Sequence, residues 1–317
     1  MMLREIVRTY PRKANGLFSL LLCGMLVACA SPPEVRTETL SRDIAIILSD
    51  NSPAFTGVLH EIQRQYKNRI EIFNLGNREG THPQMLRKIQ SSASPVVVAI
   101  GLPAAHLARN LSAKKVVFCQ VFNYENEGLV SPSMKGVSAV VPVRDQFRAW
   151  KMLAPGLKKA GVITGKNLHG LVEEAYAAAN ENHLELIHVE VRSDKETLYA
   201  YKQLSAKVQG LWLVPDNRVL SREVIRDMMG HSVREGIQVL AFSRELLGLG
   251  GVMSFESNTV DVAEQVIAKV RQAQESSGMP GADISPLAKG NMRINAVMAN
   301  RLGLTIPNEY GGLVYAP

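Results

Sequence analysis

Short apolar runs alternate with longer amphipathic segments from residue 43 onward, and this alternation limits the chain to very few folds. The first run, IAIIL at 44–48, is apolar without a break, which is typical of a strand buried on both faces. Residues 51–66 carry apolar side chains at helical spacing. Further strands are expected at 70–73, 96–100 and 116–119, and helices at 82–90 and 103–110. This β-α order predicts a parallel, doubly wound sheet.

A break follows, and then the pattern restarts. Residues 123–136 are polar and contain Gly and Pro, and 137–143 is expected to be extended. The second series predicts strands at 160–164, 184–191, 211–214, 238–242 and 251–255, and helices at 145–153, 171–182, 197–206, 221–234 and 259–274. The last helix is amphipathic and is expected to close this second half. A Gly/Pro/Ser linker at 276–286 and a segment at 293–302 end the chain.

Two series of similar size predict two α/β lobes. The expected boundaries are 43–136 for the N-terminal lobe and 137–255 for the C-terminal lobe, with a hinge near 123–144 and residues 256–317 completing the lobes and hinge. Ligands of open α/β sheets bind beyond the carboxyl ends of the strands, so a ligand cleft between the lobes is expected. Closure of the lobes around the ligand is the expected motion.

The N-terminus has the features of an export signal. Four basic residues precede an apolar run of about a dozen residues, which is too short to span a bilayer. The run ends in LVAC at 26–29, which resembles the lipobox of bacterial lipoproteins. The resemblance implies a signal peptide at 1–28, acylation of Cys29 and a tether at 29–42. An ordinary secretory signal is the alternative. Ala30 and Ser31, with no Asp after the Cys, favour the outer membrane over the inner.

Charge and cysteine content exclude several classes of function. The net charge is +7, of which residues 1–28 contribute +3, and there is no basic stripe with interleaved aromatic residues. A nucleic-acid partner is therefore not expected. The cysteines are Cys23, Cys29 and Cys119, so processing would leave Cys119 alone. Neither an intrachain disulfide nor a cysteine metal site is expected.

Candidate ligand contacts lie in the loops that follow the predicted strands. The helix N-termini after Ser52 and Gly101 suit a carboxylate or phosphate. Asp216 is the best candidate to pair with a ligand ammonium group, and Arg244 could neutralise an anion. Helix capping, core packing and plain surface exposure are the alternative roles. The full set is Ser49, Asn51, Ser52, Gly101, Leu102, Phe122, Asn123, Tyr124, Thr164, Asn167, Asp216 and Arg244.

Catalysis has little support in the sequence. There is no Gly-x-Ser-x-Gly elbow, no Gly-x-Gly-x-x-Gly fingerprint and no P-loop. The seven histidines are scattered and none forms a pair at ligand spacing. Cys119 falls inside a predicted buried strand, where a small core residue is expected. No enzyme activity, metal or cofactor is predicted.

Four stretches together resemble one family, the ABC transporter substrate-binding proteins, in the branch that includes tryptophan/tyrosine-binding lipoproteins. They are VVAIGLPAA at 97–105, LWLVPDN at 211–217, GGVMSF at 250–255 and INAVMANRLGLTIP at 294–307. The chain departs from the family pattern at NYENEGL, 123–129, and at Leu102, which replaces a threonine.

The resemblance implies a periplasmic-binding-protein type I fold. It also implies capture of an amino acid or small organic acid for an inner-membrane ABC permease, from the periplasm-facing side of the cell envelope. A sensory or structural envelope module of the same fold, acting on another membrane partner, is the alternative.

Overall fold

The computed structural model describes residues 43–76 and 82–315, which belong to a compact unit spanning 40–317. The predicted signal peptide, the tether and Cys29 lie outside the described residues. None of the helices within 43–76 and 82–315 is long and apolar enough to cross a membrane.

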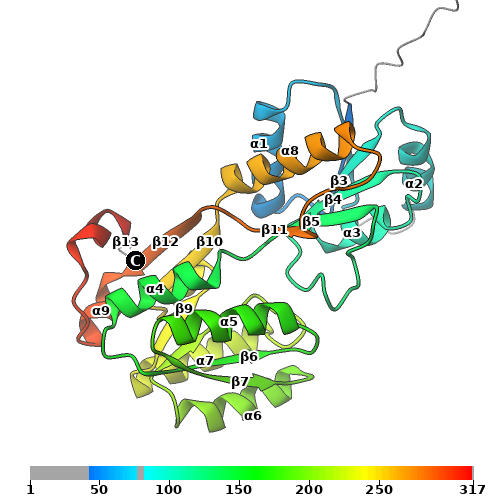
Figure 1. Cartoon of the computed structure of the whole chain (residues 1–317). Helices are drawn as coiled ribbons and strands as arrows, with labels where there is room; N and C mark the ends of the chain where they lie inside the picture. Colours follow the sequence, from blue (N-terminus) through cyan, green and yellow to red (C-terminus); the bar gives the residue numbers. More distant parts are fainter. Residues whose placement is uncertain (1–42, 77–81, 316–317) are drawn as a thin grey trace, which may run out of the picture. The chain divides into compact units, whose positions relative to one another are not determined.

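The first sheet is entirely parallel and has the strand order β11-β5-β4-β3-β1-β2 (Figure 1). The neighbouring strands β1 and β3, which lie inside the sheet, are buried at every position, because helices cover both faces. The unbroken apolar runs of the sequence predicted this burial. The strands are β1 (Ile44–Leu48), β2 (Ile70–Asn74), β3 (Val96–Ile100), β4 (Lys115–Cys119), β5 (Met134–Val137) and β11 (Ile284–Ser285).

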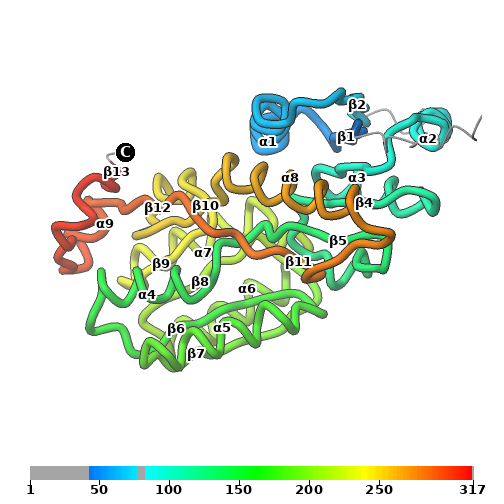
Figure 2. Tube along the Cα trace, turned by 45° about the horizontal axis from the view of Figure 1, so that its top comes forward, coloured from blue at the N-terminus to red at the C-terminus, as the bar shows by residue number. Residues whose placement is uncertain are grey.

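Two pairs of helices cover this sheet. Side chains alternate across β1, so that Ile46 packs under α1 (Pro53–Gln65) and α8 (Thr259–Glu275), whereas Ile47 faces the core beneath α2 (His82–Ser91) and α3 (Leu102–Ala108). Helix α8 lies beside α1 in both Figure 1 and Figure 2. The prediction that this helix closes the second half was therefore wrong. Its apolar face was read correctly, but an amphipathic pattern does not say which sheet the face covers.

The second sheet has the order β13-β12-β10-β9-β8-β6-β7, parallel except where β10 meets β12. Helices α4 (Val143–Leu153) and α5 (His169–Glu181) pack on one core, and α6 (Asp194–Ser205) and α7 (Arg222–Glu235) on the other. Short segments η2 (Arg244–Leu247), α9 (Ala296–Arg301) and η3 (Asn308–Leu313) complete this lobe. The strands are β6 (Lys159–Thr164), β7 (Glu185–Glu190), β8 (Gly210–Trp212), β9 (Gln238–Ala241), β10 (Met253–Ser257), β12 (Gly290–Asn295) and β13 (Val314–Tyr315).

The chain passes between the two sheets three times, at 138–142, at Asn258 and at 286–289. Hydrogen bonds join the second and third crossings, since Asp261 Oδ2 accepts from the backbone N–H groups of Ala288 and Lys289 at 2.8 and 3.0 Å. Gly290 lies against Val141 of the first crossing, where a Cβ atom would come within 2.6 Å of a methyl carbon. The three crossings form one packed hinge.

Two sequence predictions near this hinge need correction. Residues 276–286, predicted as a linker, contain β11, which pairs with β5, and the buried Met279. The extended piece predicted at 137–143 is mostly a loop, because the strand lies earlier, at β5, and α4 already begins at Val143. Strands of two to four residues are too short to show periodicity, so pairing with distant segments defines them.

Candidate functional site

A cavity of about 880 Å³ lies at the carboxyl ends of strands from both sheets. The first sheet contributes the segments that follow β1, β3 and β4, and the second sheet those that follow β8 and β9, with the end of β10. This is the edge at which parallel α/β sheets bind ligands, and the volume suits a small organic molecule.

Several aromatic side chains belong to the apolar part of the lining. Phe55, Phe122, Phe242 and Phe255 all line the cavity and are all half-buried. Each of them packs partly against a hydrophobic core. These four are half of the phenylalanines in the chain, so their concentration at one cavity is a property of the site rather than of the composition.

Trp212 forms the buried floor of the same cavity, and its indole is held from two sides. Its Nε1 donates to Gln146 Oε1 at 3.1 Å, and Phe147 packs edge-on against the ring with centroids 5.2 Å apart. Gln146 Nε2 in turn donates to the carbonyl of Val141, which lies in the first hinge crossing. The orientation of Trp212 is thereby coupled to the hinge.

Four charged residues line the cavity: Asp50, Arg244, Glu245 and Glu256. Asp50 Oδ1 accepts from the N–H of Ser52 at 2.7 Å, and Glu256 Oε1 accepts from the N–H of Arg244 at 2.9 Å. The Arg244 guanidinium lies 3.7 Å from Glu245 Oε1 and is largely exposed. A hydrogen bond from Ser243 is the main cause that lowers the pKa of Glu245, so this side chain is ionised at neutral pH.

Four of the twelve predicted contact residues line this cavity: Leu102, Phe122, Asn123 and Arg244. Tyr124 lines a smaller neighbouring cavity of about 270 Å³, where burial, followed by the charge of Glu125, raises its pKa to about 12. For these five residues, contact with a ligand stays a prediction.

The other predicted residues near the first sheet have structural partners. Ser49 Oγ donates to the carbonyl of Ile100 at 2.9 Å and accepts from the N–H of Ala104 at 3.0 Å, which ties β1 to the start of α3. Gly101 has φ of +89°, and a Cβ atom there would approach Ser49 Oγ and the Phe55 ring. Asn51 accepts from Asn74, and Ser52 precedes α1 without a side-chain capping bond.

The predicted contacts of the second sheet, Arg244 apart, also form internal hydrogen bonds. Asp216 is buried, and its two oxygens lie 2.8 Å from Nε and Nη2 of Arg218, while the N–H of Gly165 donates to Oδ2. Asp216 does not line the cavity, so the prediction that it receives a ligand ammonium group is not supported. Thr164 is hydrogen-bonded to His188, and Asn167 to Asn126.

Sequence reasoning missed the most prominent part of the lining. Phe55 lies in a segment predicted as a helix, and Trp212, Phe242 and Phe255 lie in segments predicted as strands, and none of them was among the predicted ligand contacts. A signal was present, because Phe242 directly follows β9 and Phe255 lies within the half-buried last residues of β10. Aromatic residues at the carboxyl ends of adjacent parallel strands point to the ligand edge of the sheet.

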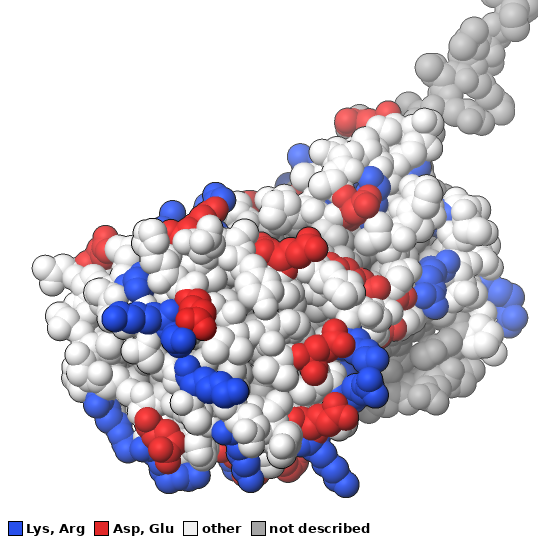
Figure 3. Space-filling model, turned by 60° about the horizontal axis from the view of Figure 1, so that its bottom comes forward, with Lys and Arg blue, Asp and Glu red and all other residues white. Residues whose placement is uncertain are grey.

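Other kinds of site find little support on the described surface. Within 43–76 and 82–315 no group of three or more His, Cys, Asp or Glu residues is placed to hold a metal ion. On the face shown in Figure 3, basic and acidic side chains are interspersed rather than gathered into a stripe of one sign.

The two parallel-dominated sheets with their flanking helices define an α/β fold of the periplasmic-binding-protein type I class. Three solved structures share it. A Streptococcus pneumonia ABC domain in complex with L-Trp is 20% identical, with a TM-score of 0.61, over 87% of this chain and 100% of that one. A ligand-free, open substrate-binding protein with adhesive properties from Clostridium difficile is 18% identical, with a TM-score of 0.67, over 86% of this chain and 98% of that one. A conserved domain protein from Vibrio cholerae is 19% identical, with a TM-score of 0.60, over 87% of this chain and 98% of that one.

The family assignment comes from the sequence itself. The model of the ABC transporter substrate binding protein family matches residues 55–315. The chain therefore belongs to this family, a class of solute-binding proteins rather than enzymes, and the resemblance seen in its motifs is confirmed. A search of curated proteins finds no match.

Proposed function

We propose that this chain captures a small organic solute for an ABC import system, holding it in the 880 Å³ cavity as the two lobes close. An amino acid or small organic acid with an aromatic or apolar body is the leading solute class. The observation that carries the proposal is the set of four half-buried phenylalanines around Trp212. Half-buried rings at the mouth of a cavity gain favourable burial when a planar or apolar group enters.

The similar Streptococcus pneumonia structure, which is a complex with L-Trp, supports a solute of this size and character. The hinge supports closure, because three short crossings packed together allow rotation of the lobes about one axis while limiting other motions. Gln146, bonded to both Trp212 and Val141, would transmit the presence of a ligand to that hinge.

A thermal-shift screen against amino acids and small organic acids tests the proposal, using the chain from residue 30 onward, which keeps the compact unit of 40–317. Binding at a hundredfold excess over the dissociation constant stabilises the folded state by about 2.7 kcal/mol. Phe242→Ala should weaken binding of the selected solute about tenfold, since it removes one wall of the site. Tyr199→Ala, at a side chain that is 70% exposed on α6, is the matched control.

No shift with any compound in demonstrably folded protein would reject solute capture. It would favour the sensory or structural envelope module that acts directly on a membrane partner.

The anchor is part of the same proposal. Acylation of Cys29 would hold the protein on the periplasm-facing side of the cell envelope, with the outer membrane favoured, while an inner-membrane ABC permease or other envelope protein serves as partner. Metabolic labelling with palmitate should mark the wild-type chain and not Cys29→Ser. Cys23→Ser is the matched control, and label retained in Cys29→Ser would reject the anchor.

A further inference from the structure

The charges around the cavity are unbalanced. Its charged lining consists of three carboxylates, from Asp50, Glu245 and Glu256, against the single guanidinium of Arg244. That guanidinium is 66% exposed and lies beside Glu245, which is 72% exposed, so the two charges are solvated and offset each other, and the surplus negative charge is that of Asp50 and Glu256. The N-termini of α1 and α3, whose first residues also line the cavity, add about half a positive charge each, which together with Arg244 is too little to reverse the sign.

Two of these carboxylates keep an oxygen available for a ligand. Among the described residues, Asp50 Oδ1 and Glu256 Oε1 accept backbone hydrogen bonds, whereas no donor is bonded to Asp50 Oδ2 or to Glu256 Oε2. Each backbone bond also orients its carboxylate. Asp50 is held at the start of α1 and Glu256 at the end of β10, so the two come from different sheets.

The aromatic residues are suited to the same kind of ligand. An organic cation is attracted to the faces of Trp and Phe rings, and the attraction grows when water is excluded. An ammonium group entering this cavity would meet half-buried phenylalanine rings and carboxylate side chains together. A carboxylate entering it would face the three carboxylates, with Arg244 as the one cationic side chain among the lining residues.

We infer that the cleft selects solutes with a net positive charge, that is, aromatic or apolar amines and quaternary ammonium compounds, over neutral analogues and over organic acids. This inference rests on the proposed function: it keeps the aromatic or apolar body of the proposed solute and replaces the amino acid or organic acid group with a cationic one. Glu256 is the main specificity-determining residue, because it is half-buried and its Oε2 is unshared among the described residues.

Three probes with one aromatic body and different charges test the inference: 3-phenylpropylamine, 3-phenylpropan-1-ol and 3-phenylpropionate. Their dissociation constants are measured by calorimetric or NMR titration of the chain from residue 30 onward, at neutral pH and low salt. The amine should bind at least about tenfold more tightly than the alcohol, and the propionate most weakly. Added salt should reduce the preference for the amine.

Two variants separate charge from shape. Glu256→Gln keeps an oxygen for the N–H of Arg244 but removes the charge, and should weaken amine binding about five- to tenfold with little effect on the alcohol. Glu223→Gln, at an exposed position on α7, is the matched control for a change of net charge. Unchanged unfolding midpoints show that each variant is folded.

Propionate binding as tight as amine binding would overturn the inference and leave the proposed function standing. So would an anionic or neutral solute from the thermal-shift screen when the amine does not bind. Failure of every probe and every screened compound would overturn the proposed function together with the inference.

Discussion

Asp216, predicted as a ligand contact, has partners within the protein for both oxygens of its carboxylate. Its carboxylate is buried, pairs with Arg218 and accepts from Gly165, which joins the loops after β8 and β6. Asp216→Asn should lower the free energy of unfolding by about 2 kcal/mol, because the partly exposed Arg218 loses its counter-charge. Urea unfolding measures the change, and Asp227→Asn, exposed on α7, is the control.

In the same variant, solute affinity should stay within about twofold of wild type. A large loss of affinity at unchanged stability would return Asp216 to the binding site.

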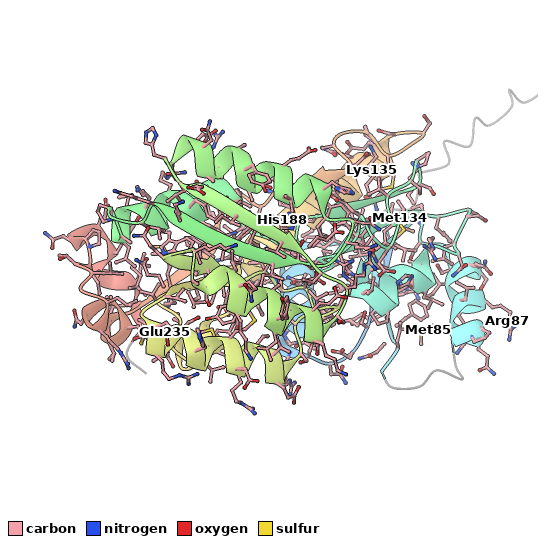
Figure 4. All side chains as sticks on the ribbon, turned by 90° about the horizontal axis from the view of Figure 1, so that it is seen from below. Met85, Arg87, Met134, Lys135, His188 and Glu235 are labelled. Atoms are coloured by element: carbon pink, nitrogen blue, oxygen red, sulfur yellow. The ribbon has the colours of Figure 1, made fainter. Side chains whose placement is uncertain are left out.

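His188 gives a pH dependence whose sign follows from its surroundings. It lies on β7, bonded to Thr164, and Figure 4 shows it apart from Met134 and Lys135 of the other sheet. Burial lowers its pKa, an effect that the charge of Glu190 opposes in part. His188 therefore binds a proton more readily in the unfolded chain than in the folded protein. Its contribution to the free energy of unfolding is fully present above about pH 6.5 and is lost as the pH falls through the pKa of His188 in the folded protein.

The contribution of His188 to the slope is at most about 1.4 kcal/mol per pH unit, the limit for one proton. Urea unfolding between pH 7.5 and 5 should show a shallower slope for His188→Gln than for wild type. His60→Gln, at an exposed position on α1, should keep the wild-type slope. Equal slopes in all three proteins would contradict the assignment.

Among the elements, α8 starts at a cap that also belongs to the hinge. Asn258 Oδ1 accepts from the N–H groups of Val260 and Asp261 at 2.9 and 3.2 Å, and its amide donates to Asn291. Asn258→Ala should lower the free energy of unfolding by about 1 kcal/mol, as loss of an N-cap usually does. Thermal unfolding checks this. Asn258→Ser should recover most of the loss, and a serine variant as unstable as the alanine variant would show that capping is not the cause.

The elements that sequence predicted well are those defined by local patterns. The runs at 44–48 and 96–100 coincide with β1 and β3, and the helix predicted at 221–234 begins after its Ser221 cap and ends at Gly236, whose φ is +68°. Elements defined by distant partners were missed. Ile284 belongs to a strand only because it pairs opposite Gly136, and no local pattern contains that information.

The site was predicted only in part, for a related reason. Sequence located the strand ends correctly, which is why Leu102, Asn123 and Arg244 do line the cavity. It could not tell which polar groups are already bonded within the protein, as at Ser49 and Asp216. The sequence also could not show that Phe242 and Phe255, in predicted strands, would be only half-buried.

For the whole molecule, the three crossings mean that neither lobe is a continuous stretch of chain. The core beneath α1 includes Val262, Val266 and Val270 of α8, together with Leu287. A fragment covering 43–136 should therefore lack a cooperative urea transition by circular dichroism, because one face of its sheet is uncovered. Adding a peptide covering 258–289 should restore a transition, and cooperative unfolding of the fragment alone would contradict this account.

Helix α8 also affects when folding can finish. A ribosome makes the chain from its N-terminus, and domains usually fold in that order as they emerge. Here the core of the first sheet is covered only when α8 and residues near 287 have been synthesised, and by then most of the second lobe has been made. The first lobe can therefore complete its core only after most of the second lobe has been made, so the two lobes mature almost together.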